Sequence, residues 1–321
     1  MDLGLFQDRA LAELTYYHRR TSDLVLSVPL PPSTGQSSEL QNVGVLSDHG
    51  WEAALTTVNV DKPGFTWRSR LSLAHDRNRV DKLVTPTDTL VFDYLNAVIQ
   101  GQPIGVFFGG YYARNPDGSI AYAPVNVTMQ GKPYTLMLPV RALDTLPTGA
   151  IVPARKVIGD PNPSLIASLS NSFQLGRRLE LSVLLDGRFG NKVANFTRRI
   201  TELFGVDKDV EREITGDTIP RTFSLNPAGR SLIYEEYIEN GAFVKLREIA
   251  LAIHFDEAFA RHFGAQTMDV RLAARNLHTW TSYRGLDPEV NLFAASTVSR
   301  GVDFADTPIP RSFTASVNFT F

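Results

Sequence analysis

Alternation of apolar and polar residues runs to the very end of this chain. In the closing segment FTASVNFTF, Phe313, Ala315, Val317, Phe319 and Phe321 alternate with four polar residues. Successive side chains of a β-strand point to opposite faces of its sheet, so the pattern predicts an amphipathic strand. Chain termini are usually polar and loosely held. A last strand that ends on phenylalanine therefore needs an explanation.

The same period of two recurs along the chain, whereas helical periodicity is scarce. A short helix is expected only in DEAFARHFGAQ, at residues 256–266. The predicted fold class is all-β, an antiparallel sheet of about nine or ten strands with long loops at one rim. We expect strands over residues 10–19, 50–60, 64–76, 103–113, 164–175, 178–189, 243–255, 267–277 and 312–321, with a weaker pair within 121–140.

The two faces of these strands leave two architectures open. In RLELSVLLDGRF, one face carries Leu179, Leu181, Val183 and Leu185, and the other carries Arg178, Glu180, Asp186 and Arg188. A soluble β-sandwich turns its apolar face inward and its polar face to water. A transmembrane barrel turns its apolar face to lipid and its polar face to a wet lumen. Alternation alone is compatible with a carbohydrate-binding sandwich, with a small complete barrel, or with part of a large barrel.

The connectors differ strongly in length. Tight turns with glycine or proline are expected at Asp61–Gly64 and around Gly176. The connectors at residues 191–240 and 285–310 are long, which is unusual inside a compact domain. Short turns on one side and long loops on the other are typical of bacterial outer-membrane barrels.

Composition excludes several classes of function. The formal net charge of −2 gives no basis for nucleic-acid binding. The chain has no cysteine, its six histidines show no metal-ligand spacing, and the glycine-rich stretches match no phosphate-binding motif. No GxSxG nucleophile motif occurs either. We therefore predict a protein that is not an enzyme and that needs no metal and no cofactor. The beginning, MDLGLFQDRALAEL, does not have the pattern of a secretory signal.

Several motifs, in order along the chain, resemble one family. The segments with this resemblance include QNVGVLSDHGWEAAL, GQPIGVFFGGYYA, IGDPNPSLIASLSNSF, NGAFVKLREIALAIHF, RNLHTWTSYRGLDPEV and the closing FTASVNFTF. Together they resemble the SusC/RagA family of TonB-linked outer-membrane transporters. The resemblance extends from about Leu5 to Phe321.

The resemblance implies a multi-pass β-barrel in the Gram-negative outer membrane that imports oligosaccharides or peptides. Such a barrel has about 22 strands and a plugged lumen. The implied partners are a SusD-like surface lipoprotein, the TonB complex acting through the plug, the barrel assembly machinery and outer-membrane lipid. The plug, the signal peptide and the first part of the barrel have no counterpart here. We therefore expect residues 1–321 to be the C-terminal portion of a barrel domain, from a truncated, split or partial gene product.

Three sets of candidate residues follow from this resemblance. The lumen-facing candidates, which could equally serve only to keep the interior wet, are Arg178, Glu180, Asp186, Arg188, Asp269, Arg271 and Arg275. The loop candidates for substrate contact, whose alternative role is to form a simple turn, are Trp280, Tyr283, Arg284, Asp287 and Glu289. The candidate assembly signal is made of Phe313, Val317, Phe319 and Phe321.

Overall fold

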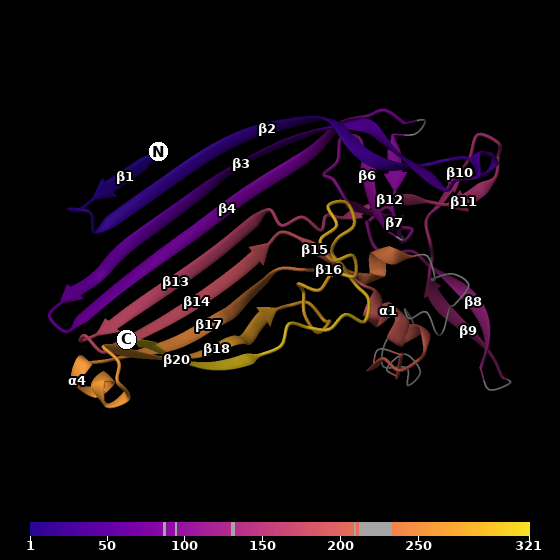
Figure 1. Ribbon diagram of the computed structural model, residues 1–321. Coiled ribbons are helices and arrows are strands. Elements are labelled where there is room, and N and C mark those ends of the chain that lie inside the picture. Colours follow the sequence, from indigo (N-terminus) through magenta and orange to yellow (C-terminus); the bar gives the residue numbers. More distant parts are fainter. Residues whose placement is uncertain (86–87, 94, 130–131, 209, 212–232) are drawn as a thin grey trace.

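The computed structural model describes residues 1–85, 88–93, 95–129, 132–208, 210–211 and 233–321. Its largest unit is a nine-stranded sheet in the order β1-β2-β3-β4-β13-β14-β17-β18-β20 (Figure 1). The strands are β1 (Asp2–Leu5), β2 (Ala10–Pro29), β3 (Ser38–Lys62), β4 (Phe65–Leu83), β13 (Leu165–Leu175), β14 (Leu179–Phe189), β17 (Phe243–Phe255), β18 (Thr267–Thr281) and β20 (Ser312–Thr320).

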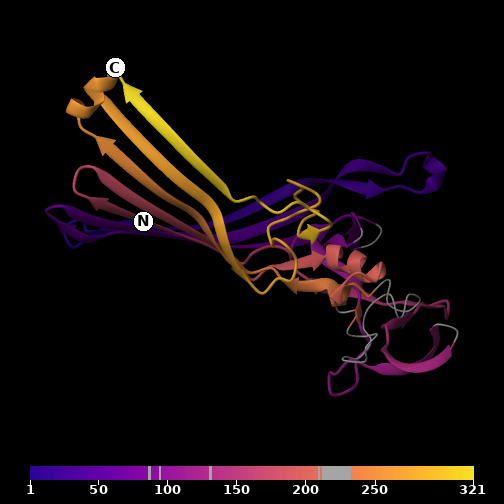
Figure 2. The same cartoon turned by 90° about the horizontal axis from the view of Figure 1, so that it is seen from below.

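All neighbours in this sheet are antiparallel and follow the order of the chain. Strands β1 and β20 form its two edges, and the sheet is strongly twisted and curved (Figure 2). The predicted all-β antiparallel fold is confirmed. β2 and β3 run well beyond the predicted residues 10–19 and 50–60, because their far ends pack Leu26, Val28 and Val43 into a core at the loop end of the sheet.

Tight turns close the strands at one end of the sheet. Gly64 and Gly176 adopt positive φ values of 85° and 61° in two of these turns, a conformation that favours glycine. The connection between β17 and β18 forms α4 (Glu257–Ala260) and η3 (Arg261–Phe263). Asp256 caps α4 by accepting a hydrogen bond from the backbone N–H of Phe259 at 3.1 Å. The short helix predicted in this turn is confirmed.

The long connectors fold into small units at the other end of the sheet (Figure 1). One is a four-stranded sheet, one a three-stranded sheet, and two are hairpins. Their strands are β5 (Thr89–Val91), β6 (Asn96–Ile99), β7 (Val106–Gly110) and β12 (Arg155–Gly159); β15 (Lys192–Asn195), β16 (Ile238–Asn240) and β19 (Val302–Asp303); and the pairs β8 (Tyr122–Met129) with β9 (Lys132–Pro139) and β10 (Leu143–Thr145) with β11 (Ile151–Pro153).

The prediction for residues 103–113 was wrong in part. Only β7 is a strand there, and it belongs to the four-stranded sheet rather than to the large one. Val106 and Phe107 are both fully buried, so this continuous apolar run forms the core of a small unit. The weaker pair predicted within residues 121–140 is the separate β8–β9 hairpin.

The helical elements are short. They include α1 (Phe196–Leu203), η1 (Pro32–Thr34) and η2 (Tyr234–Tyr237). Among the residues that the structure describes, no helix is long and apolar enough to cross a membrane.

Buried hydrophobic clusters lie at the loop end of the sheet. One cluster joins the far ends of β2, β3 and β4 to β5 and β6, and includes Val80 and Val98. The other joins Phe107 of β7 to Phe196 of α1 and Val302 of β19. Within the described residues, the middle of the large sheet contributes to neither cluster. The long strands are therefore stabilised mainly by the hydrogen bonds between them and by the surroundings that their two faces contact.

Candidate functional site

The two faces of the large sheet differ in chemistry along its whole width. Directly paired residues share a face, and the pairing aligns Leu55, Leu71 and Leu169 on one side. Several large side chains of this apolar side are exposed: Leu55 by 41%, Leu272 by 46% and Phe313 by 76%. A soluble sandwich would bury this side against a second sheet. The exposed apolar side is what a lipid-facing surface requires.

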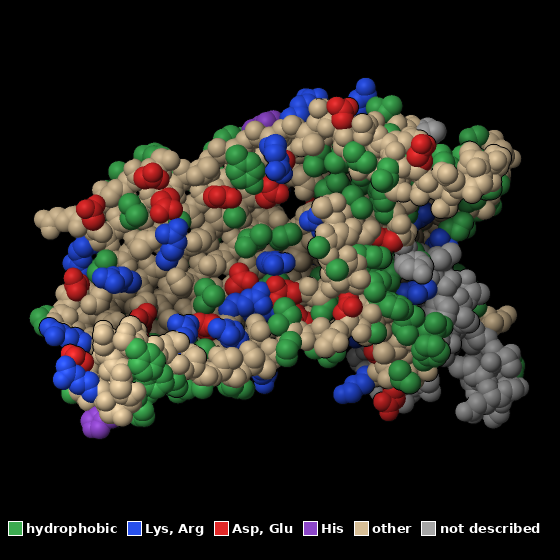
Figure 3. Space-filling model, viewed as in Figure 1, with side chains coloured by type: hydrophobic (Ala, Val, Ile, Leu, Met, Phe, Trp, Pro, Cys, Tyr) green, Lys and Arg blue, Asp and Glu red, His purple; other side chains and the backbone are tan. Residues whose placement is uncertain are grey.

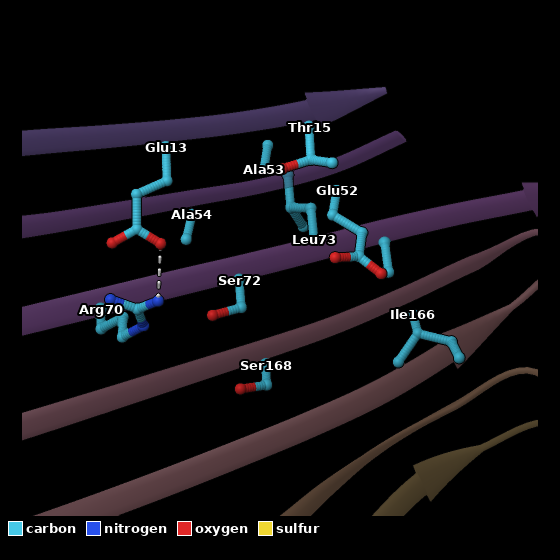
Figure 4. Close-up of a pocket in the computed structure, with 11 residues that line it drawn as sticks. Glu13, Thr15, Glu52, Ala53, Ala54, Arg70, Ser72, Leu73, Ile166 and Ser168 are labelled. Carbon is cyan, nitrogen blue, oxygen red and sulfur yellow. Dashed lines mark hydrogen bonds and ion pairs between the residues drawn. The ribbon is translucent and has the colours of Figure 1, made fainter. Parts of the chain in front are cut away.

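The opposite side of the sheet is polar and carries ionised residues such as Glu13, Arg70 and Glu248. Figure 3 shows charged side chains spread over the visible surface of the molecule. A shallow hollow of about 270 Å³ lies on this side, lined by residues of β2, β3, β4 and β13. Figure 4 shows Glu13 and Arg70 pointing into it and joined by an ion pair of 3.2 Å between Oε2 and Nη2. A second hollow of about 290 Å³ follows, lined by Arg68 and Glu248 among others. These surfaces offer hydrogen-bond donors and acceptors to a hydrated, polar solute.

Four of the predicted lumen residues lie on this polar side in the C-terminal strands. Arg271 Nη2 and Arg275 Nε each donate to Glu248, at 2.6 Å in both cases. Asp269 lies 2.6 Å from Nδ1 of His254. On β14, Glu180 accepts a hydrogen bond from Ser172 at 3.4 Å. Each of these contacts joins neighbouring strands across the polar face.

Arg178 is placed differently from the other predicted lumen residues. It precedes β14, in the turn that follows β13, and it forms an ion pair with Asp256 beside α4. Its side chain is 70% exposed. The structure therefore places Arg178 at the tight-turn end of the sheet rather than on the wall.

The remaining predicted lumen residues, Asp186 and Arg188, meet two of the loop candidates in one group of charges. We call it the loop-anchoring cluster; its members are Asp186, Arg188, Lys245, Arg247, Asp287 and Glu289. Lys245 Nζ lies 2.6 Å from Asp287 and 2.5 Å from Glu289. Arg247 Nη2 bridges Asp186 at 2.7 Å and Glu289 at 2.6 Å. Three cations thus balance three carboxylates, which buried charges require.

Sequence reasoning did not single out Lys245 and Arg247. Both precede the alternating segment on β17, and the register of that strand shifts between Leu246 and Glu248. A second shift against β14 occurs at the same level, between Leu184 and Leu185. These bulges re-aim the side chains near the loop end. One signal in the sequence was available: the basic pair Lys245 and Arg247 in FVKLRE. Two basic side chains need carboxylate partners if the strand that carries them is buried.

The loop after β18 folds back over the polar side of the sheet. Its strand β19 pairs in parallel with β15, with Ala194 opposite Val302. Tyr283 is buried and donates its hydroxyl to Asp303 at 2.5 Å. Burial and the nearby carboxylate raise the pKa of Tyr283, so it stays protonated. The loop is therefore tied to the sheet at both ends, by Tyr283 and by the loop-anchoring cluster.

Two of the loop candidates lie apart from that cluster. Trp280 is still in β18, opposite Val244 of β17, on the side of the sheet that faces away from Lys245. Its ring meets His278 edge to face, with centroids 4.6 Å apart. Arg284 lies at the loop surface, and its backbone N–H donates to Glu239 at 2.9 Å. The structure brings Asp287 and Glu289 together and leaves Trp280 outside the group.

The residues of the candidate assembly signal lie on the apolar side. Phe313, Val317 and Phe319 pair with Ala274, Val270 and Met268 of β18. Phe321 follows β20 by one position, is 78% exposed, and has its ring 6.3 Å from that of Phe319. Phe263 of η3 packs against Phe319 from the turn below, with ring centroids 5.7 Å apart.

The charge state of Glu289 makes the anchoring of the loop depend on pH. Burial on its own would raise the pKa of Glu289, but hydrogen bonds from Arg247 and Lys245 outweigh burial and lower it. A carboxyl whose pKa is lowered by folding stabilises the folded state fully when the pH is above its pKa in the unfolded chain, about 4.3 for Glu. This stabilisation is lost as the pH falls through the lower pKa of the folded state. We expect the loop to stay anchored down to about pH 5 and to loosen below about pH 4.

Hydrogen exchange of residues 285–303, corrected for the intrinsic exchange rate, measures this loosening. The Glu289→Gln variant supplies the control, because it should show a flatter pH dependence in the same range. Equal pH profiles for the two proteins would contradict the role given to Glu289.

Curated relatives match the chain from end to end. The TonB-dependent receptor P26 of Formosa agariphila is 29% identical over 344 residues, covering 100% of this chain and 34% of that receptor. The TonB-dependent receptor P3 of the same organism is 26% identical, with 100% and 33% covered. The TonB-dependent receptor SusC of Bacteroides thetaiotaomicron is 24% identical, with 98% and 30% covered. The chain thus spans about a third of the length of these relatives, and it matches no family model.

Solved structures agree on the fold. The RagAB peptide importer in its "closed-closed" state superposes with a TM-score of 0.73 at 22% identity, covering 100% of this chain and 34% of that one. The "open-open" state gives a TM-score of 0.70 at 21% identity, with 99% and 33% covered. The relatives are receptors and importers rather than enzymes, as predicted for this chain.

TonB-dependent receptors are β-barrel proteins of the outer membrane, which confirms the predicted location. The open antiparallel sheet with its long loops agrees with part of such a barrel. In sequence and in fold, this chain resembles the barrel of SusC/RagA-type TonB-dependent receptors of the outer membrane.

Proposed function

We propose that this chain forms the C-terminal portion of the barrel of an outer-membrane nutrient importer. One observation carries the proposal: the nine-stranded sheet exposes large apolar side chains on one side and ionised side chains on the other. In a bilayer the first side faces lipid and the second faces a wet lumen. The similarity to TonB-dependent receptors along the whole chain supports the same reading.

The proposed cargo is an oligosaccharide or a peptide. The polar side presents Arg70, Glu13, Arg271 and Glu248 in ion pairs along the path that a solute would follow. Paired charges keep such a wall hydrated without a strong net field, which suits a polar cargo that must be released again. The residues named here would line the passage, and no bond of the cargo would be broken.

The proposed partners are a SusD-like lipoprotein at the loop end and the TonB complex acting through a plug. The small units at the loop end project well beyond the sheet (Figure 1), and they offer the surface that such a lipoprotein could cover. Exposed apolar side chains on the β10–β11 hairpin, Leu143, Leu146 and Ile151, are compatible with such a contact.

Growth of the source bacterium on defined nutrients tests the proposal. A strain in which the gene for this receptor is deleted should lose growth on one class of polymer, either a glycan or a protein digest. It should keep growth on the matching monosaccharides or amino acids, and the restored gene should bring the lost growth back. Unchanged growth of the deletion strain on every polymer of the panel would overturn the proposal.

Replacing Phe321 with alanine should impair assembly rather than transport. The exposed ring completes the apolar side of β20, and the proposed assembly signal includes it. We expect a several-fold lower amount of folded receptor in the outer membrane, since the loss of a terminal aromatic weakens an interaction of about 1–3 kcal/mol. Heat-dependent electrophoretic mobility of outer-membrane extracts measures the folded amount.

Phe304→Ala is the matched control, because Phe304 is exposed in the loop at the other end of the molecule. The molecules of the Phe321→Ala protein that do fold should import at the normal rate per receptor. A normal amount of folded receptor with slow import would contradict a role in assembly.

A further inference from the structure

The apolar side of β2, β3 and β4 ends in a row of aromatic rings near the loop end. Tyr16, Trp51 and His75 are directly paired across the three strands, and Trp51 stacks on His75 with centroids 5.8 Å apart. A second aromatic pair, Trp67 and Phe173, stacks at 5.7 Å near the tight turns. Eight residues of β4 separate the two levels, about 26 Å along the strand and about 20 Å across a tilted barrel wall. The separation is of the same order as the apolar band of outer-membrane barrels, which is about 25 Å tall and bordered by aromatic girdles.

Basic side chains lie immediately beyond the outer aromatic row, on the same side of the sheet. The next paired positions are His18, His49 and Arg77, and the positions after them are Arg20, Ser47 and Arg79. All of these except Ser47 are exposed. We call Arg20, Arg77 and Arg79 with the two histidines the basic row. In an outer-membrane barrel, the level just beyond the outer aromatic girdle is that of the headgroups of the outer leaflet.

Among the described residues, no carboxylate forms an ion pair with the arginines of the basic row, Arg20, Arg77 and Arg79. This contrasts with Arg19, one position away on the polar side, which pairs with Asp48 at 2.6 Å. The same face does carry one carboxylate, Asp81, and it accepts a hydrogen bond from Ser47 at 2.9 Å.

A hollow of about 440 Å³ opens beside β4 at this level. His49, Arg77 and Arg79 line it together with the loop at Asp160, Asn162 and Ser164. The two carboxylates on its lining are already engaged, since Asp160 accepts from Asn162 at 2.9 Å and Asp76 accepts from Tyr17 at 2.6 Å. The hollow therefore places the guanidinium groups of Arg77 and Arg79 beside neutral hydrogen-bonding groups and two carboxylates that already accept hydrogen bonds.

We propose that the basic row binds the phosphorylated glycolipid of the outer leaflet, of the lipid A type. Its phosphates would pair with Arg20, Arg77 and Arg79, because guanidinium forks match phosphate oxygens. Its sugars would enter the hollow beside β4, and its acyl chains would lie along the apolar side below Trp51. This site rests on the outer-membrane location of the chain, and its three arginines lie on the side of the sheet opposite the proposed import path.

Native mass spectrometry of the receptor, extracted from outer membranes in mild detergent, tests the site. The triple variant Arg20→Gln, Arg77→Gln, Arg79→Gln should bind added lipid A at least about 50-fold more weakly than the unaltered protein, since each basic side chain near an anionic surface contributes about fivefold. The triple Arg→Lys variant should recover most of this binding. The matched control removes three exposed charges at the tight-turn end, with Lys62→Gln, Arg177→Gln and Arg261→Gln, and should bind as the unaltered protein does.

A second measurement uses only the unaltered protein, so it does not depend on the folding of any variant. Dephosphorylated lipid A and phosphatidylglycerol should each displace bound lipid A poorly. Equal binding of lipid A by the Arg→Gln variant would overturn the proposal, and so would efficient displacement by the dephosphorylated form. A third outcome is that the Arg→Gln variant loses the mass peak of a receptor dimer while its lipid binding stays unchanged. In that case the basic row is an interface between two receptors, and the proposal is wrong.

Discussion

Lys245→Met should release the loop of residues 282–311 from the sheet. The Lys245 side chain is only 2% exposed, and its Nζ contacts both Asp287 and Glu289. Removing it leaves two buried carboxylates without their nearest cation, and breaking a buried ion pair costs about 3–5 kcal/mol. Arg247 still reaches Glu289, so the damage should centre on Asp287 and on the part of the loop that it holds.

Hydrogen exchange of residues 285–311 in the membrane-inserted receptor measures this release. Protection of the backbone amides there should fall by about a hundredfold or more, while the amides of β17 and β18 keep their protection. The backbone N–H of Ile309, which donates to Asp287 at 3.2 Å, should be among the groups that lose it.

A charge-balanced variant separates the loss of the ion pairs from the loss of the lysine stem. Lys245→Met combined with Asp287→Asn and Glu289→Gln leaves no uncompensated charge at these three positions and should restore a large part of the protection. Arg261→Met, an exposed cation in the turn below, serves as the surface control. Unaltered protection in the Lys245→Met protein would mean that the cluster does not anchor the loop.

Release of the loop should also widen the passage. The loop lies over the polar side and is joined to β15 through β19, so in a closed barrel it would cover part of the mouth. Single-channel conductance in planar bilayers should rise for Lys245→Met and return toward normal for the charge-balanced variant. This expectation depends on the proposed import function, whereas the exchange measurement does not.

Period-two alternation predicted the long strands because it records directly which side of a sheet each residue occupies. The pattern at residues 178–189, 243–255 and 267–277 placed Leu181, Leu251 and Leu272 on one side, and the structure pairs them there. The same reasoning misplaced residues 103–113. A run that is apolar at successive positions shows no alternation, so it does not indicate which residues face which side of a sheet.

The loop-anchoring cluster lay beyond the reach of sequence reasoning for a different reason. Asp186 and Glu289 are about a hundred positions apart, and they share Arg247 only because β14 and β17 are neighbours and a bulge turns that side chain inward. Local pattern identified Asp287 and Glu289 as a polar group near a turn. It could not show that two cations from β17 would be buried beneath them.

Arg198→Met should unfold the small units at the loop end while the long strands persist. Arg198, at the start of α1, is 8% exposed and donates to Glu202 at 3.0 Å, to Glu239 at 2.8 Å and to Glu236 at 3.2 Å. Burial on its own would lower the pKa of Arg198, but the three carboxylates raise it, so the guanidinium stays charged. Methionine fills similar space and removes the positive charge that these three carboxylates share.

The expected cost is at least the 3–5 kcal/mol of one broken buried ion pair, because several carboxylates lose the same partner. Glu202 should be strongly affected, because its side chain is 2% exposed and it loses its ion pair with Arg198, while the hydroxyl of Tyr237 still donates to it at 2.7 Å. Helix α1 should detach from η2 and β16, the elements that hold Glu236 and Glu239. The long strands should be spared, because their ladder and their faces are independent of this group.

Limited trypsin digestion of the inserted receptor, with hydrogen exchange of residues 192–208 and 234–240, measures this selective unfolding. Lys192→Met is the matched control, since Lys192 is an exposed cation on β15 in the same unit and its loss should leave the digestion pattern unchanged. Arg198→Lys should be intermediate, because one ammonium cannot reach three carboxylates with the planar fork of arginine. If Arg198→Met and Lys192→Met were digested alike, the fold at the loop end would have to depend on the hydrophobic packing of Phe107, Phe196 and Val302 alone.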